Sequence, residues 1–112
     1  MNYTPERGDI IRLDFDPSVG KEINKLQRPA LVLSPLAFNK SMGLAFVAPI
    51  TSTIRNIPME ISLPEKMETT GVIQPWQTRS YDWIERRAKF VEKLDAKSTQ
   101  RVSDYVKLCI GG

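Results

Sequence analysis

The chain has 112 residues, 41% hydrophobic and 26% charged, so we expect one globular domain spanning residues 1–112. Sixteen basic against thirteen acidic residues give a net charge of +3, which permits a polyanionic ligand without requiring one. The sequence has no histidine and one cysteine, which excludes a Cys/His zinc cluster, an intrachain disulfide and any Ser-His or Cys-His catalytic couple.

Short apolar runs between Gly, Pro and Asn residues predict a series of short β-strands over most of the chain. Apolar and polar side chains alternate over residues 9–15, as in a half-buried strand. Residues 29–34 and 43–50 are continuous apolar runs, which are typical of strands covered on both faces. The remaining predicted elements are a helical turn at 36–40 and shorter strands at 59–63, 71–73 and 89–91.

The C-terminal segment changes period from two to between three and four. Its apolar stripe at i, i+3, i+4 and i+7 predicts an amphipathic helix and consists of Val102, Tyr105, Val106 and Cys109. Asp95 is a suitable N-cap for this helix, and the terminal glycine pair ends the pattern. We therefore expect a mainly β fold, a compact barrel with one C-terminal α-helix.

Two connections are candidates for function because they display polar side chains at strand ends. Residues 16–27 form a connection longer than a hairpin needs, and such loops in small domains are often functional. Residues 51–58 are shorter and equally polar. A rigid scaffold commonly presents its working residues in such loops.

At this point the residues resemble the MazF/PemK family over about residues 7–110. The resemblance rests on a set of motifs in order and register: Gly8-Asp9-Ile10-Ile11, Asp14-Phe15-Asp16-Pro17, Gly20-x-Glu22, Arg28-Pro29-Ala30-Leu31-Val32-Leu33-Ser34, Asn39, Pro49-Ile50-Thr51, Gly71-Val72, Gln77, Ser80 and Trp83. A single one of these motifs would carry no information, whereas their combined order and spacing is specific.

The resemblance implies an SH3-like small barrel of the CcdB/MazF/PemK type that forms a homodimer. It also implies a toxin of a type II toxin–antitoxin system that inhibits translation and growth. Such a toxin cleaves single-stranded RNA at short sequence motifs without metal or cofactor, leaving a 2′,3′-cyclic phosphate and a 5′-hydroxyl. Its expected partner is an acidic antitoxin, and it would meet operator DNA only through the antitoxin complex.

The resemblance also assigns catalytic roles. Arg28 aligns with the key arginine of the family, and its permanent charge suits a phosphate whose oxygens gain charge in the transition state. Thr51 aligns with the catalytic threonine, whose hydroxyl can donate to a phosphoryl oxygen. In a chain without histidine, Glu22 is the preferred proton acceptor. Asp16 is the alternative and ranks second, because Asp-Pro after a strand equally indicates a turn.

Substrate-binding candidates are the basic and amide side chains near the predicted strand ends. They are Lys21, Lys25, Asn39, Arg55, Gln77 and Arg79. Asp16 and Trp76 are further substrate-binding candidates of other chemical types, and Arg86 and Arg87 could also line a groove that binds phosphates. Asn39 and Gln77 either read base edges or brace loops. Trp76 stands where the family commonly has an acidic residue, and it either stacks on a base or belongs to the core or a dimer interface, whereas Trp83 is interpreted as core.

Two other functions remain open at this stage. One is a non-enzymatic toxin similar to CcdB, which binds and poisons DNA gyrase through its C-terminal helix; the other is an SH3-like interaction module without catalysis. The polar strand ends bearing arginine and threonine argue against the second. We expect a cytoplasmic protein without membrane contact, because one cysteine fits a reducing compartment and no apolar stretch reaches the length of a membrane span.

Overall fold

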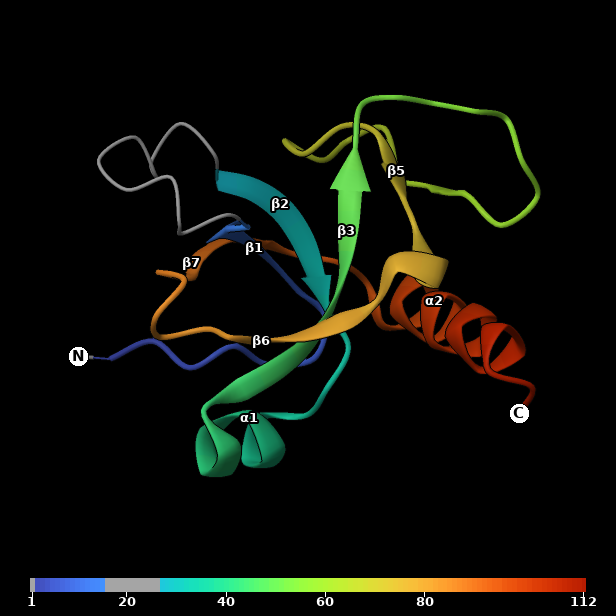
Figure 1. Ribbon diagram of the computed structural model, residues 1–112. Coiled ribbons are helices and arrows are strands. Elements are labelled where there is room, and N and C mark those ends of the chain that lie inside the picture. The colour runs from blue at the N-terminus through green and yellow to red at the C-terminus, as the bar shows by residue number, and fades with distance from the viewer. Residues whose placement is uncertain (1, 16–26) are drawn as a thin grey trace.

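The computed structural model describes residues 2–15 and 27–112, in which a curved antiparallel sheet forms a half-barrel beside a C-terminal helix (Figure 1). The sheet has the strand order β4-β5-β3-β2-β1-β7, with β6 paired to β3 outside this path. The strands are β1 (Asp9–Asp14), β2 (Gln27–Val32), β3 (Leu44–Thr51), β4 (Ile61–Ser62), β5 (Val72–Ile73), β6 (Arg79–Asp82) and β7 (Lys89–Lys93). The helices are α1 (Leu36–Met42), the 3₁₀ helix η2 (Pro75–Gln77) and α2 (Ala96–Cys109). The predicted mainly β fold is confirmed.

β3 organises the sheet because it has different partners along one edge. Its first half pairs with β6, from Leu44 to Val47, whereas Ile50 and Thr51 pair with β5. Its other edge pairs with β2. The 3₁₀ helix η2 connects β5 to β6 in the chain, and the two strands pair with successive parts of the same edge of β3.

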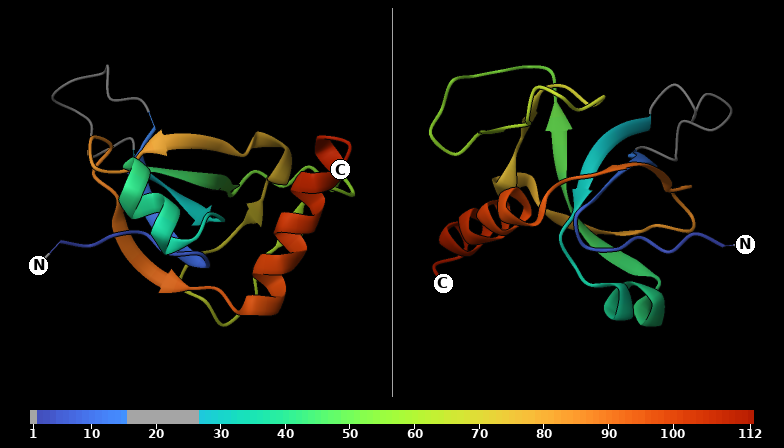
Figure 2. Two further views of the ribbon diagram at one scale, coloured as in Figure 1. Left: turned by 90° about the horizontal axis from the view of Figure 1, so that it is seen from below. Right: turned by 180° about the vertical axis from the view of Figure 1, so that it is seen from behind.

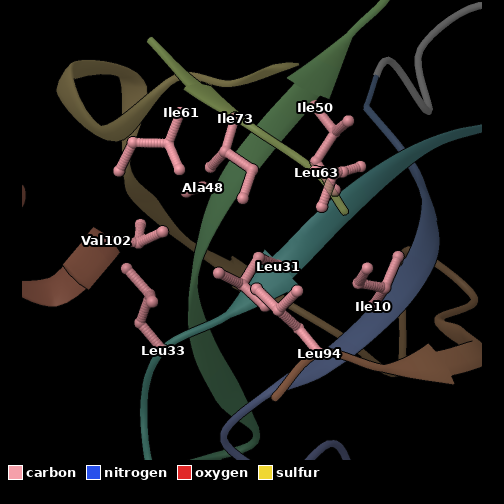
Figure 3. Close-up of a cluster of buried hydrophobic side chains, with 10 residues drawn as sticks. All are labelled: Ile10, Leu31, Leu33, Ala48, Ile50, Ile61, Leu63, Ile73, Leu94 and Val102. Carbon is pink, nitrogen blue, oxygen red and sulfur yellow. The ribbon is translucent and has the colours of Figure 1, made fainter. Parts of the chain in front are cut away.

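Two buried clusters lie on the two faces of the central strands. Ile10 and Leu31 are paired across β1 and β2 and enter one cluster, while Ile11 and Ala30 are paired and enter the other. Figure 3 shows the first cluster, in which Val102 of α2 points toward side chains from several strands. Because neighbouring side chains point to opposite faces, the continuous apolar runs of the sequence cover both faces of one sheet.

The C-terminal helix begins as the sequence predicts. The Asp95 side chain accepts a hydrogen bond from the Ser98 N–H, 2.9 Å away, and this bond holds the pKa of the Asp95 carboxyl below its usual value. Val102 is buried, but Cys109 at the end of the predicted stripe is exposed. The predicted stripe is therefore too long by one turn, since the sheet does not extend under the last turn of α2 (Figure 2).

β6 was not predicted from the sequence. Arg79, Ser80 and Asp82 are exposed and only Tyr81 is partly buried, so the segment lacks the apolar alternation by which strands are recognised. Backbone pairing with β3 forms this strand. β2 also begins at Gln27, two residues before the predicted start, and this earlier start includes Arg28 in the sheet.

Within residues 2–15 and 27–112, no helix is long and apolar enough to cross a membrane.

Candidate active site

Arg28 and Thr51 lie at the same end of the neighbouring strands β2 and β3. The last pair of the β2–β3 ladder is Ala30 with Pro49, and Arg28 and Thr51 each lie two residues beyond it, on one face of the sheet. Figure 1 shows the start of β2 and the end of β3 at the same end of the sheet, in the upper part of the view. The Arg28 side chain is exposed and Thr51 is partly exposed, so both are accessible to a ligand.

The Thr51 hydroxyl has a defined orientation. Its Oγ1 accepts a hydrogen bond from the Thr53 N–H, 3.1 Å away. Because this bond uses the oxygen as an acceptor, the hydroxyl proton remains free for donation to a ligand oxygen. The backbone of Thr51 is itself held between β3 and β5 through its pairing with Val72.

Arg28 and Thr51 line two neighbouring hollows, which we call the front and rear hollows. The front hollow is lined by Phe15, Arg28, Pro49, Ile50, Thr51, Thr53, Arg55, Gln74, Gln77, Arg79 and Tyr81. The rear hollow is lined by Arg12, Gln27, Arg28, Pro29, Ile50, Thr51, Ser52, Thr53 and Thr70. Neither set contains a carboxylate, so the described walls of both hollows favour an anion.

The loop that carries Arg55 is fixed by one carboxylate. Glu60 Oε2 accepts from the Arg55 N–H at 2.9 Å, and Glu60 Oε1 accepts from the Asn56 N–H at 2.9 Å. Asn56 adopts a positive φ of 56°, which an Asn tolerates in a tight turn. The Arg55 side chain therefore starts from a defined backbone and reaches the front hollow.

Of the residues proposed from the sequence, the structure brings five to this site: Arg28, Thr51, Arg55, Gln77 and Arg79. Trp76 lies in η2, which contacts α2, and it is outside the linings of both hollows although its neighbour Gln77 lines one. Four further candidates lie outside the described residues: Asp16, Lys21, Glu22 and Lys25.

Asn39 does not fit the substrate contact suggested for it. It is fully buried, its Oδ1 accepts from Ser34 Oγ at 2.6 Å, and its Nδ2 donates to the Pro5 carbonyl at 2.7 Å. Its own carbonyl accepts from Trp83 Nε1 at 3.0 Å. It belongs to α1, which lies at the far end of β3 from Thr51 (Figure 1). Asn39 braces the N-terminal segment, the β2–α1 connection and Trp83.

Replacing Asn39 with alanine is expected to destabilise the fold by about 2–3 kcal/mol, because the buried partners of the amide lose their hydrogen bonds. Urea unfolding measures this loss. The kcat/KM for RNA, the substrate that the family resemblance implies, is expected to stay within about twofold of the parent value when measured without urea. A stable variant with a raised KM would instead return Asn39 to the substrate site.

Arg86 is also removed from the set of phosphate-binding candidates. Its Nη1 donates to the backbone carbonyls of Asp14, at 3.2 Å, and Phe15, at 2.8 Å. Its guanidinium lies 4.8 Å from the centre of the Tyr81 ring. These contacts hold Arg86 against the protein, whereas Arg87 is exposed and lies 3.9 Å from the buried carboxylate of Asp14.

Several residues that line the hollows were not predicted from the sequence, among them Arg12, Phe15, Gln74 and Tyr81. Arg12 and Phe15 lie on opposite faces of the strand predicted at residues 9–15. The alternation of apolar and polar side chains in this strand was the sequence signal available for them. Tyr81 lies on β6, which the sequence pattern did not reveal.

Gly71 is the glycine on which the Thr51 backbone depends. It has a φ of 118°, and a Cβ added there would lie 2.3 Å from the Thr51 carbonyl oxygen. Such a distance is far below van der Waals contact, so any side chain would push β5 and β3 apart. Gly43 also has a positive φ, 69°, but an added Cβ there meets no atom within 4 Å.

We therefore expect Gly71→Ala to destabilise the protein by about 2 kcal/mol and to lower RNA cleavage about 10-fold at full folding, because Thr51 is displaced. Gly43→Ala is the matched control, with a cost of about 1 kcal/mol from its backbone conformation and unchanged cleavage. Thermal unfolding and single-turnover cleavage together check both variants. Equal behaviour of the two variants would contradict the role assigned to the Gly71–Thr51 contact.

Among residues 2–15 and 27–112, no three His, Cys, Asp or Glu side chains gather where they could hold a metal ion.

Residues 6–110 match a protein family described as PemK-like, MazF-like toxin of type II toxin-antitoxin system. The endoribonuclease toxin MazF of Escherichia coli K12 is 33% identical to this chain over 109 residues, which cover 97% of this chain and 96% of the relative. The endoribonuclease toxin ChpB of the same strain is 42% identical over 88 residues, which cover 75% of each chain. A crystal structure of MazE–MazF from Deinococcus radiodurans superposes with a TM-score of 0.86 at 33% identity, covering 98% of each chain.

Proposed function

The chain belongs to the PemK-like and MazF-like toxins of type II toxin–antitoxin systems. From this premise we propose that it cleaves RNA in an active site formed by Arg28 and Thr51. It is an endoribonuclease toxin, as its relatives MazF, ChpB and PemK are named. One observation supports this placement of the site more than any other. Arg28 and Thr51 both line the front and the rear hollow, and the described walls of these hollows carry no acidic side chain.

The proposed chemistry is the one that the family resemblance implies, and these two side chains suit it. The ribose 2′-hydroxyl attacks the adjacent phosphorus, and the bond from phosphorus to the 5′-oxygen breaks, leaving a 2′,3′-cyclic phosphate and a 5′-hydroxyl. Arg28 stabilises the negative charge that builds on the non-bridging oxygens, and the Thr51 hydroxyl donates to one of them. Glu22, outside the described residues, is proposed as the acceptor of the 2′-hydroxyl proton, and the departing 5′-oxygen takes its proton from water.

Substrates with a single 2′-deoxy nucleotide test this chemistry directly. If the 2′-hydroxyl is the nucleophile, removing it on the 5′ side of a mapped cut abolishes that cut and leaves other cuts in the same RNA unchanged. Removal on the 3′ side of the cut serves as the matched control and is expected to change the rate little. Cleavage that continues at the modified position would show that water, rather than the 2′-hydroxyl, attacks.

We propose single-stranded RNA, cut at a short sequence motif without a metal ion, as the substrate. The front hollow offers the Gln74 and Gln77 amides, which can both donate to and accept from a base edge, and such edges are free in a single strand. An arginine and a hydroxyl supply charge stabilisation without metal coordination. We propose messenger RNA as the natural single-stranded substrate, and therefore the cytoplasm as the compartment in which the toxin acts.

The alternative of a gyrase poison similar to CcdB is not favoured. The relatives of similar length are endoribonucleases, and this chain presents an accessible arginine and threonine that line the same hollows. An interaction module without catalysis would not need this pair.

An antitoxin is the partner that the MazE–MazF structures support for a toxin of this kind. We propose that its binding segment is acidic and partly apolar, lies over the front and rear hollows, and orders on binding. Operator DNA would then be contacted only through the complex. Affinity for the antitoxin is expected to fall as salt rises from 50 to 500 mM, and an affinity indifferent to salt would contradict electrostatic docking.

We also propose a homodimer. Nine large apolar side chains are at least 40% exposed in the described part of the single chain, including Leu108 at 65% and Ile110 at 79%. Association of two chains would remove part of this apolar surface from water. Sedimentation velocity at micromolar concentration tests the proposal, and a monomer at all concentrations would reject it.

A further inference from the structure

Two aromatic side chains form one wall of the front hollow. The Phe15 and Tyr81 rings have centroids 5.2 Å apart with an interplanar angle of 39°. Both residues line the hollow that also contains Arg28 and Thr51. Both are only partly buried, so part of each side chain is accessible from the hollow.

Arg86 fixes the Tyr81 ring from behind. The Arg86 guanidinium lies 4.8 Å from the ring centre and is anchored by its hydrogen bonds to the Asp14 and Phe15 carbonyls. Arg86 does not line the front hollow, so the part of the ring that it covers is turned away from the hollow. Arg79, by contrast, lines the hollow, is exposed and lies 5.9 Å from the same ring centre. The ring is held by a cation–π contact with Arg86 on the protein side, and the exposed Arg79 guanidinium lies near it at the hollow.

We propose that the front hollow is a nucleobase subsite beside the scissile phosphate and that Tyr81 is the surface on which the base stacks. This inference rests on the proposed function, since it assumes that Arg28 binds the phosphate. A ring already fixed by Arg86 loses little conformational entropy when a base stacks on it. The volume of the hollow, about 370 Å³, falls within the range of about 300–1,000 Å³ typical of small-molecule sites.

The remaining walls suit a nucleotide whose base lies against Tyr81. Arg79 projects from the same face of β6 as Tyr81, because the two are separated by one residue, and it is placed to accompany the backbone phosphate. The Gln74 and Gln77 amides then face the base edge. Tyr81 is thereby a specificity-determining residue rather than a catalytic one.

Tyr81→Ile tests the proposal, because Ile keeps an apolar side chain suited to a strand and removes the ring. On RNA containing the mapped cleavage motif, this variant is expected to lower kcat/KM about 5- to 100-fold. Tyr81→Phe keeps the ring and is expected to remain within about threefold. Phe46→Leu removes an exposed aromatic side chain from the neighbouring strand, opposite Ser80, and is expected to change nothing.

Abasic substitutions locate the stacked base. Each nucleotide flanking the cut is replaced in turn by an abasic residue, and Tyr81→Ile is compared with the parent on every RNA. The proposal predicts that the defect of the variant disappears at one position, where no base remains to stack. Equal kcat/KM of Tyr81→Ile and parent on the intact RNA would overturn it, as would a defect that is the same on every abasic RNA.

A binding measurement separates failure of the subsite from failure of the proposed function. Uncleavable 2′-O-methyl strands carry 2-aminopurine at each position in turn, and stacking on Tyr81 quenches its fluorescence at one position in the parent but not in Tyr81→Ile. Position-specific quenching without any cleavage of unmodified RNA would keep the subsite and reject the endoribonuclease. Cleavage that is unaffected by Tyr81→Ile, with no position-specific quenching, would keep the endoribonuclease and reject the subsite.

Discussion

Arg28→Ala is expected to lower the rate of RNA cleavage about 10³-fold, the largest effect of any single substitution in this protein. The guanidinium stabilises charge that exists mainly in the transition state, so the loss should appear in kcat rather than in KM alone. Arg28 is exposed, and its removal leaves no described buried group without a partner. The free energy of unfolding should therefore change by less than about 0.5 kcal/mol.

Single-turnover kinetics on one short RNA, with urea unfolding of each variant, checks this expectation. Arg28→Lys keeps the charge but not the planar fork of donors, and it should recover only part of the rate. Arg101→Ala is the matched control, because Arg101 is an exposed arginine of α2 that lies 5.6 Å from the Tyr105 ring centre and lines neither the front nor the rear hollow. A rate for Arg28→Ala equal to that of Arg101→Ala would remove Arg28 from the site.

Thr51→Val is expected to lower the cleavage rate about 10²-fold. Valine has nearly the shape of threonine and keeps the strand conformation, so the change isolates the hydroxyl. The hydroxyl accepts one hydrogen bond, from the exposed Thr53 N–H, and water can replace that partner. Stability should therefore change by no more than about 1 kcal/mol.

Thr51→Ser restores the hydroxyl on a less restricted side chain and should keep most of the rate. Measuring the three proteins on a phosphorothioate RNA adds a second readout. If the hydroxyl donates to a non-bridging oxygen, replacing that oxygen with sulfur should slow the parent more than it slows Thr51→Val. An identical slowing of both proteins, together with full activity of Thr51→Val, would contradict the assigned role.

Most of the fold could be predicted from the sequence because most elements carry a periodic signal. The alternation in residues 9–15 and the apolar runs at 29–34 and 43–50 reappear as β1, β2 and β3. The N-cap at Asp95 reappears in the hydrogen bond from Ser98. β6 could not be predicted, since its side chains are mostly exposed and its formation depends on pairing with β3, which is distant in the chain.

The candidate site was predicted less completely, for a related reason. The resemblance supplied Arg28 and Thr51, but their adjacency depends on the β2–β3 register, which no local pattern reveals. Asn39 was assigned in part to the substrate because an amide suits a base edge, whereas its burial and its hydrogen bonds to Ser34 and Pro5 follow from tertiary packing. Tyr81 was not predicted as a site residue, because it lies in β6, which was not predicted either.

Cleavage of a long unstructured RNA by the purified protein in excess EDTA, with primer extension to map every cut, tests the central claim most directly. The account predicts discrete cuts at one short motif, unaffected by EDTA and absent from the Arg28→Ala reaction. No cuts from a folded protein, or cuts that require a divalent ion and persist in Arg28→Ala, would contradict a metal-independent site built on Arg28 and Thr51.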